Sequence, residues 1–247
     1  MAESKPPLGF IAIDVVLHRP PGDPFSEATW PFPIIREKAN DSTVSEVVSG
    51  SSYSKDFIDR FVDAGQRLAD RGAVGIITSC GFLAMAQPEL AARLPVPVAT
   101  SALIQVPSIL SILPADRAVG IITFDADRLS NTHLERLHID PSHCYIRGAT
   151  SGGPLQRHIR NGEEYVHSEL MHELVEVAQG LLMDHPDIGA FCLECTQMPA
   201  FADEISNAVQ LPVYDVYTMG CWFYSSLCRY RPKRWDLPTK DTIETRE

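Results

Sequence analysis

The chain has 247 residues, enough for one large α/β domain or two smaller lobes. Hydrophobic residues make up 45% of it and charged residues 21%, which is the balance of an ordinary globular protein. A formal net charge of −11 argues against nucleic acid or an anionic membrane as the main partner, although a few local donors can still hold a small anionic molecule.

Apolar runs of strand length recur along the chain, separated by segments with helical periodicity. The runs are continuous rather than alternating, which predicts strands buried on both faces and hence parallel sheets. The predicted strands cover residues 9–16, 73–78, 96–99, 118–124, 144–148, 188–193 and 212–216. The predicted helices cover residues 55–71, 87–93, 103–113, 129–137, 163–183, 200–209 and 217–229. Because strands and helices alternate, we expect an α/β protein.

The predicted elements divide into two lobes with a boundary near Pro114. Residues 1–114 together with 211–229 form the expected first lobe, residues 115–210 form the second, and residues 230–247 form a polar tail.

Two further features concern this organisation. The hexapeptide AVGIIT occurs at residues 73–78 and 118–123, either as a trace of duplication or, as we favour, because two strands meet the same packing demand. Residues 17–54 form an irregular connection that is either a functional lid or surface decoration. Within it, Arg19 and Trp30 either anchor or cover a ligand or, as we favour, belong to the surface decoration.

The segment AVGIITSCGFLA, residues 73–84, places Cys80 where an apolar strand ends. Ligands of open α/β sheets lie at the carboxyl ends of strands. Gly81 lets the backbone approach a ligand closely, and the start of the following helix favours a thiolate and lowers the thiol pKa. A lone cysteine in such a place is nevertheless more often inert packing.

The segment IGAFCLECTQMPAF, residues 188–201, repeats this arrangement at Cys195. Two cysteines that face each other across a cleft between lobes can remove a proton from one face of a carbon and return one to the other. Strand alternation predicts that the side chain of Glu194 points away from Cys195, in a structural role.

Other chemistries find little support. Cys192 and Cys195 spell C-x-x-C, but residues three apart on a strand point to opposite faces and no second pair follows, so we expect no metal and a core position for Cys192. All five lysines lie in polar or terminal stretches, which argues against a Schiff base with pyridoxal phosphate. No apolar run approaches the roughly 20 residues of a membrane span, and no secretory signal opens the chain. We expect a cytoplasmic protein with reduced cysteines.

The segments TSCGFL and LECTQMP resemble the two cysteine signatures of the aspartate/glutamate racemase superfamily. Together with HRPPGD, WPFP and LPVYDV they resemble a branch labelled aspartate/glutamate racemase family protein, over roughly residues 8–229. The resemblance implies two doubly wound parallel-sheet lobes related by pseudo-twofold symmetry, with the active site in the cleft between them. It also implies chemistry without cofactor or metal, as in amino-acid and hydantoin racemases, maleate isomerases and arylmalonate decarboxylases.

The resemblance further implies roles for particular residues. Cys80 and Cys195 match the two catalytic cysteines, and Asp14 matches an acidic position near the reacting centre. Ser79 either contacts the ligand or simply ends its strand. The positions that would hold the substrate carboxylate are Gly81, Phe82, Thr123, Thr196 and Gln197. Gly-Phe replaces Asn-Thr after the first cysteine, and Thr-Gln replaces Thr-His after the second. A larger or less polar acid, or a cyclic amide such as a hydantoin, is therefore at least as plausible as a dicarboxylic amino acid.

We therefore expect an isomerase, a cofactor-independent racemase or epimerase that exchanges protons at a carbon α to a carboxylate or carbonyl. Two alternatives stay open: a maleate-type cis–trans isomerase, in which one cysteine adds to an alkene, and a non-enzymatic binder of small molecules on the same scaffold. The expected partner is a small-molecule acid, and a homodimer is the default assembly.

Overall fold

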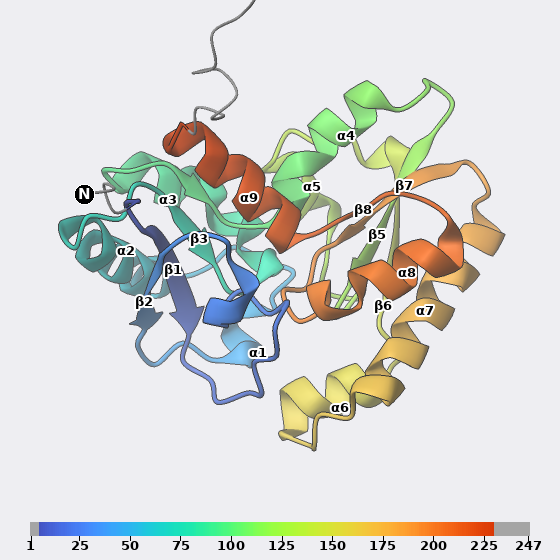
Figure 1. Ribbon diagram of the computed structural model, residues 1–247, viewed down its shortest axis with the longest axis horizontal. Helices are drawn as coiled ribbons and strands as arrows, with labels where there is room; N and C mark the ends of the chain where they lie inside the picture. The colour runs from blue at the N-terminus through green and yellow to red at the C-terminus, as the bar shows by residue number, and fades with distance from the viewer. Residues whose placement is uncertain (1–4, 230–247) are drawn as a thin grey trace, which may run out of the picture.

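Two parallel sheets of four strands each form the centre of the protein, one in each lobe (Figure 1). The computed structural model describes residues 5–229, and the expected tail at 230–247 lies outside them. The first sheet has the order β2-β1-β3-β4, built from β1 (Leu8–Ile13), β2 (Ile34–Ala39), β3 (Ile76–Thr78) and β4 (Val98–Ala99). The second has the order β6-β5-β7-β8, built from β5 (Ala118–Thr123), β6 (Cys144–Gly148), β7 (Ile188–Leu193) and β8 (Val213–Tyr214).

Helices connect the strands of each sheet. The α-helices are α1 (Val44–Val47), α2 (Lys55–Asp70), α3 (Gln87–Arg93), α4 (Val106–Ile112), α5 (Asn131–Glu135), α6 (Pro154–Asn161), α7 (His167–Asp184), α8 (Ala202–Val209) and α9 (Val216–Leu227). The 3-10 helices are η1 (Glu27–Thr29), η2 (Gly81–Ala86), η3 (Ala102–Gln105), η4 (Pro141–His143) and η5 (Pro199–Phe201). The expected α/β architecture of two doubly wound lobes is confirmed.

The two sheets repeat one strand order, because β5 to β8 follow each other in space as β1 to β4 do. The two copies of AVGIIT do not occupy equivalent places in this repeat. One ends in β3, the third strand of its lobe along the chain, and the other forms β5, the first strand of its lobe. Their identity therefore reflects a common packing demand on two central strands, which are paired on both sides.

Both faces of the first sheet are covered, which is why its strands are apolar throughout. Phe10 of β1 belongs to one buried cluster with Met219 of α9, and Ile11 belongs to another with Phe61 of α2. The helix α2 forms here because the Ser54 hydroxyl caps its first turn and its apolar side chains line one side. It ends before Gly72, whose φ of +86° suits glycine.

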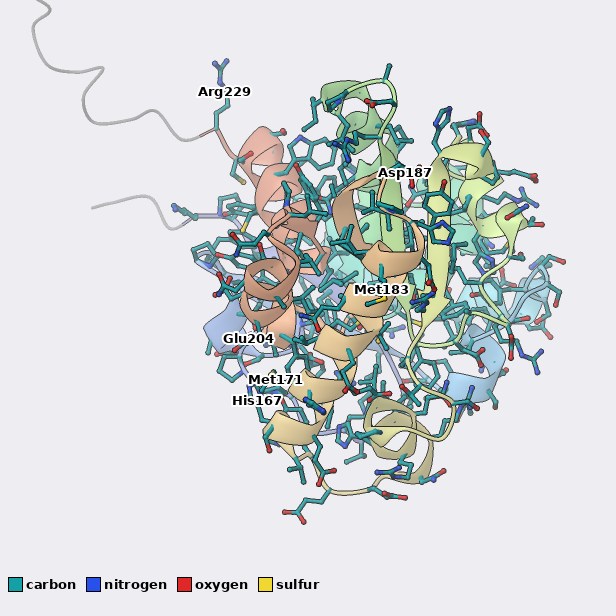
Figure 2. The ribbon with its side chains drawn as sticks, turned by 90° about the vertical axis from the view of Figure 1, so that its right-hand side faces the viewer. His167, Met171, Met183, Asp187, Glu204 and Arg229 are labelled. Atoms are coloured by element: carbon teal, nitrogen blue, oxygen red, sulfur yellow. The ribbon has the colours of Figure 1, made fainter. Side chains whose placement is uncertain are left out.

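In the second lobe, α7 covers the outside of the sheet, and Figure 2 looks onto this face with His167 near the start of the helix and Met183 near its end. Its buried side includes Leu174 and Glu173, which are 0% and 5% exposed. The Glu173 carboxylate accepts hydrogen bonds from the backbone N–H groups of Thr150 and Leu155, at 2.9 and 2.8 Å. A side chain of α7 thereby satisfies donors at the start of α6.

Three elements differ from the sequence expectation. The connection at 17–54 contains the edge strand β2 and the short helix α1, and the glycine-rich segment after β6 leads into α6. The segment 211–229, assigned above to the first lobe, is divided: β8 pairs with β7 in the second sheet, and α9 returns to the first lobe (Figure 1). Across residues 5–229 no helix combines the length and the apolar character needed to cross a membrane.

Candidate active site

Cys80 and Cys195 occupy equivalent places in the two lobes. Cys80 follows β3 and Cys195 follows β7, and each of these strands lies beside the first strand of its own sheet. Both cysteines line one cavity of about 430 Å³, part of it open to solvent, to which both lobes contribute. The ends of two strands that are far apart in the sequence therefore meet at one site, as expected for parallel sheets.

The chain turns in the same way after each cysteine. The backbone N–H of Phe82 lowers the pKa of the Cys80 thiol, and that of Gln197 does the same for Cys195. Three residues after each cysteine, a backbone N–H donates to the cysteine carbonyl: Leu83 to Cys80 at 3.1 Å and Met198 to Cys195 at 3.0 Å. The two halves of the site are thus related by a local pseudo-symmetry.

Most residues expected at the site line this cavity. They are Ser79, Cys80, Gly81, Phe82, Cys195, Thr196 and Gln197. The Ser79 hydroxyl accepts a hydrogen bond from the Ile13 N–H at 2.8 Å, so it joins the ends of β3 and β1. The Ser79 carbonyl accepts one from the Thr196 hydroxyl at 2.6 Å, which links the two lobes directly beside the cysteines.

Asp14 and Thr123 are not among the residues that line the cavity. The Asp14 carboxylate pairs with Lys38 at 2.7 Å, and this contact lowers its pKa. The Thr123 hydroxyl is buried and donates to Oε2 of Glu194 at 2.7 Å. Thr123 therefore reaches the site through Glu194.

Glu194 lines the cavity, and the expectation that it points away from the site is corrected. Strand β7 ends at Leu193, so the alternation of side chains no longer governs Glu194 and Cys195. The Glu194 side chain is 1% exposed, and its Oε1 atom has no hydrogen-bond partner among the described residues. Burial raises the pKa of this carboxyl to about 7, against the hydrogen bonds from Thr123 and from the Phe124 backbone.

The two thiols do not have the lowered pKa that their strand-end positions suggest. Burial raises the pKa of Cys80 and of Cys195, and the nearby Glu194 raises both further. The N–H groups of Phe82 and Gln197 act in the opposite direction but are outweighed, because desolvation of a thiolate costs more than one hydrogen bond returns.

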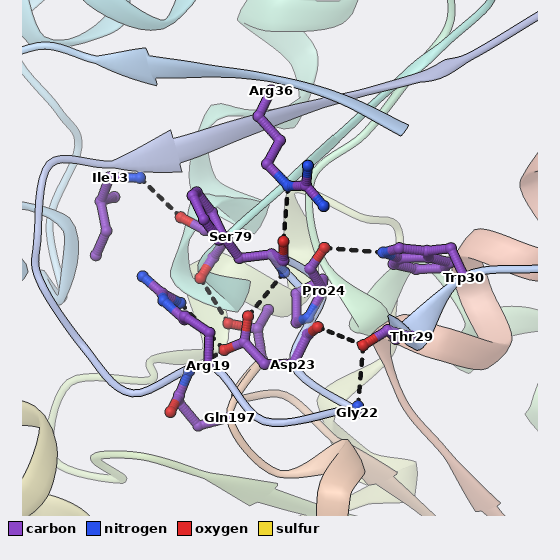
Figure 3. A network of polar contacts seen from close by, with 12 residues as sticks. Ile13, Arg19, Gly22, Asp23, Pro24, Thr29, Trp30, Arg36, Ser79 and Gln197 are labelled. Atoms are coloured by element: carbon purple, nitrogen blue, oxygen red, sulfur yellow. Dashed lines mark hydrogen bonds and ion pairs between the residues drawn. The ribbon is translucent and has the colours of Figure 1, made fainter. Parts of the chain in front are cut away.

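A part of the irregular connection between β1 and β2 reaches the site and contributes Arg19 to its lining (Figure 3). Nη1 of Arg19 pairs with Oδ2 of Asp23 at 3.1 Å. Asp23 is 1% exposed and also accepts hydrogen bonds from the Phe25 N–H, at 2.7 Å, and from Nε2 of Gln197. Gln197, a residue of the second cysteine signature, is thereby tied to the connection.

The same connection is held further along by Trp30, whose indole donates to the Pro24 carbonyl at 2.8 Å (Figure 3). The ring lies against Gly220 of α9, where a Cβ atom would be 2.4 Å from it. Periodicity carries no signal for such long-range contacts, so sequence reasoning left Arg19 open and missed Asp23.

The remaining wall of the cavity is apolar, with side chains from both lobes. Its members are Ile13, Leu17, Val44, Val47, Val48, Phe124 and Ile159. Within residues 5–229, no three His, Cys, Asp or Glu side chains gather in a way that would hold a metal ion. The arrangement offers two thiols, a carboxyl of raised pKa and one guanidinium in a small apolar space, which suits proton transfer to and from a small acid.

Solved structures of this architecture include several enzymes. An allantoin racemase from Pseudomonas fluorescens superposes with a TM-score of 0.62 at 17% identity, over 89% of this chain and 90% of that one. A glutamate racemase from Francisella tularensis, in complex with D-glutamate, gives 0.53 at 19% identity over 92% and 85%. Unliganded arylmalonate decarboxylase gives 0.56 at 18% identity over 90% and 92%. The expected resemblance to the aspartate/glutamate racemase superfamily is confirmed at the level of the fold.

Sequence comparison leads to enzymes of another class. A dimethylsulfoniopropionate lyase from Durusdinium sp. clade D is 28% identical over 221 residues, which are 87% of this chain and 73% of that protein. Dimethylsulfoniopropionate lyase 5 from Emiliania huxleyi is 24% identical over 231 residues, 90% of this chain but 46% of that protein. The chain thus spans about half the length of the second relative. No family model matches the chain.

Proposed function

We propose that this protein is an enzyme that removes a proton from a carbon next to a carboxylate, with Cys80 and Cys195 as the groups that exchange protons. The observation that carries the proposal is that both thiols, from equivalent strand ends of two lobes, line one small cavity. In either direction of the reaction, the thiolate of one cysteine takes the α-proton, and the thiol of the other donates a proton to the opposite face of the carbon. The overall reaction is a racemisation or epimerisation.

The charge that develops on the substrate during this reaction needs hydrogen-bond donors. The turns after the two cysteines supply backbone N–H groups, whereas the Thr196 hydroxyl already donates to the Ser79 carbonyl at 2.6 Å. Such fixed donors in a site shielded from water stabilise an enolate-like transition state. A neutral Glu194 favours the thiolate, because an ionised carboxylate beside it would add a second negative charge.

Proton exchange with solvent tests the proposal. The protein is incubated in D₂O with a panel of chiral carboxylic acids, amino acids and hydantoins, and α-deuterium and optical rotation are followed by NMR and polarimetry. For a substrate that is turned over, Cys80→Ala and Cys195→Ala should each lower the rate of racemisation by about 10²- to 10⁴-fold.

Cys144→Ala is the matched control, because Cys144 lies on β6 outside the residues that line the cavity. Equal rates in the wild type and both site variants would contradict the proposal.

A second candidate function is favoured by the sequence comparison. The lyases resemble this chain over 87% and 90% of its length. In a β-elimination the same first step occurs: a thiolate takes the α-proton of dimethylsulfoniopropionate. The carbon–sulfur bond then breaks, its electron pair leaves with dimethyl sulfide, and the new double bond gives acrylate. One proton is released to the solvent through the thiol, so atoms and charge balance.

Gas chromatography separates the two functions. Incubation with dimethylsulfoniopropionate should release dimethyl sulfide and acrylate in equal amounts if the protein is a lyase, and a cysteine variant should abolish the release. Deuterium exchange without any loss of substrate supports the racemase. If the protein carries out neither reaction, with dimethylsulfoniopropionate or with any compound of the panel, the result supports a non-enzymatic binder of small molecules.

A further inference from the structure

Among the described residues that line the cavity, Arg19 is the only one with a positive charge. Its side chain is 14% exposed, although it belongs to an irregular connection and not to a helix or strand. A guanidinium that is removed from water to this degree needs partners for its N–H groups.

The partners that the protein supplies are incomplete. Only Nη1 of Arg19 makes a hydrogen bond, to Asp23, and the other N–H groups have none with the described residues. The Asp23 carboxylate is not dedicated to Arg19, because the Phe25 N–H and the Gln197 side chain share it. Below the guanidinium lies the Phe25 ring, whose centroid is 5.3 Å from Cζ. The contacts fix the position of the charge and leave donors for a ligand.

We propose that Arg19 is the residue that binds the substrate carboxylate, so that the connection between β1 and β2 carries the anchor for small carboxylic acids. This inference rests on the proposed function, because Arg19 would orient the substrate for that reaction. A carboxylate at Arg19 receives two N–H groups in the fork geometry that guanidinium offers. The adjacent carbon then lies within the small cavity that both cysteines line.

The chain provides a matched control in Arg36 of β2. Cζ of Arg36 is 5.2 Å from the centroid of the same Phe25 ring, and its Nε donates to the Phe25 carbonyl at 2.7 Å. Its Nη1 pairs with Glu27 at 2.9 Å. Arg36 resembles Arg19 in its aromatic and ionic contacts, but it does not line the cavity.

Alkylation of the two cysteines by a charged and an uncharged reagent tests the anchor without any catalysis. Iodoacetate and iodoacetamide attack the same thiolate and differ in their carboxylate. The rates at Cys80 and Cys195 are measured by peptide mass spectrometry, and the ratio of the two rates is independent of how much thiolate is present. Arg19→Gln should lower this ratio roughly tenfold, the typical effect of one hydrogen bond to a charged group. Arg19→Lys, which keeps the charge without the fork, should lower it less. Arg36→Gln should leave it unchanged.

A second measurement uses the wild-type protein alone and does not depend on the folding of a variant. Propionate should protect the cysteines from iodoacetamide, and propionamide at the same concentration should not. An unchanged ratio in Arg19→Gln, or equal protection by the acid and the amide, overturns the inference. A lowered ratio in a protein that neither exchanges protons nor eliminates would keep Arg19 as a carboxylate anchor and reject the proposed reaction.

Discussion

Beside Cys80, a glycine and a glutamate from different lobes share one small space. A Cβ atom on Gly81 would lie 2.3 Å from the Glu194 carbonyl oxygen and 2.3 Å from its Oε1 atom. No side chain fits there, which explains why glycine directly follows the cysteine. The close approach also deprives Oε1 of Glu194 of water, and it has no other partner among the described residues. The raised pKa of Glu194 follows from this contact between the lobes.

Glu194 should make the stability of the protein depend on pH. Because its pKa rises from 4.5 in the unfolded chain to about 7 in the fold, its contribution to the free energy of unfolding is complete below pH about 4.5 and falls as pH rises to about 7. The loss amounts to about 3 kcal/mol. Glu194→Gln removes the titration, so the difference in unfolding free energy between wild type and variant should shift by this amount between pH 4.5 and 8. Urea denaturation at several pH values measures the two unfolding free energies. A constant difference between wild type and variant across this pH range would contradict the prediction.

The elements show where sequence patterns suffice and where they do not. The continuous apolar runs predict the central strands because burial on both faces leaves a strong local signal. Strand β2, with the sequence IIREKA, is half-buried at an edge, and its three consecutive charged residues leave neither a continuous apolar run nor an alternation to identify it. Helix α6 follows Gly152 and Gly153 and begins at Pro154, and the carboxylate that supports its start lies on α7. No local pattern reports such a partner.

The dependence of α6 on α7 can be measured. Glu173→Ala leaves the Thr150 and Leu155 N–H groups without their acceptor, so the free energy of unfolding should fall by about 1–3 kcal/mol. Glu176 lies on the exposed side of the same helix, where its side chain is 66% exposed and, among residues 5–229, pairs with His172 at 3.2 Å. Glu176→Ala should change stability by no more than about 0.5 kcal/mol. Equal losses in the two variants would show that Glu173 does not support α6.

At the scale of the whole molecule, the lobes are not independent. Phe82 of the first lobe belongs to the same buried cluster as Phe191 of the second, and α9 crosses back to the first sheet (Figure 1). The cysteine signatures predicted which strand ends meet, since equivalent ends of parallel sheets face one cleft. They did not predict Arg19 and Asp23, because the connection between β1 and β2 reaches the second lobe without a regular pattern.

The shared core predicts that the two lobes unfold together. Met219 of α9 is 0% exposed, so Met219→Ala should lower the free energy of unfolding by about 2–5 kcal/mol. Calorimetry should show a single transition in both wild type and variant. Trp222→Ala, on the exposed side of the same helix with 56% of the residue accessible, is the control. A second transition in the variant would mean that the lobes are separate cooperative units.

Two residues of the connection between β1 and β2 give the two equivalent thiols unequal surroundings. The charges of Arg19 and Asp23 act on Cys195 and have no counterpart at Cys80. For a racemase this means that the two enantiomers of a substrate are deprotonated by different cysteines, although the same residue binds their carboxylate. Mirror-image molecules have equal free energies in solution, so the ratio kcat/KM must be the same for both. If one enantiomer has the lower KM, its kcat must therefore be lower by the same factor.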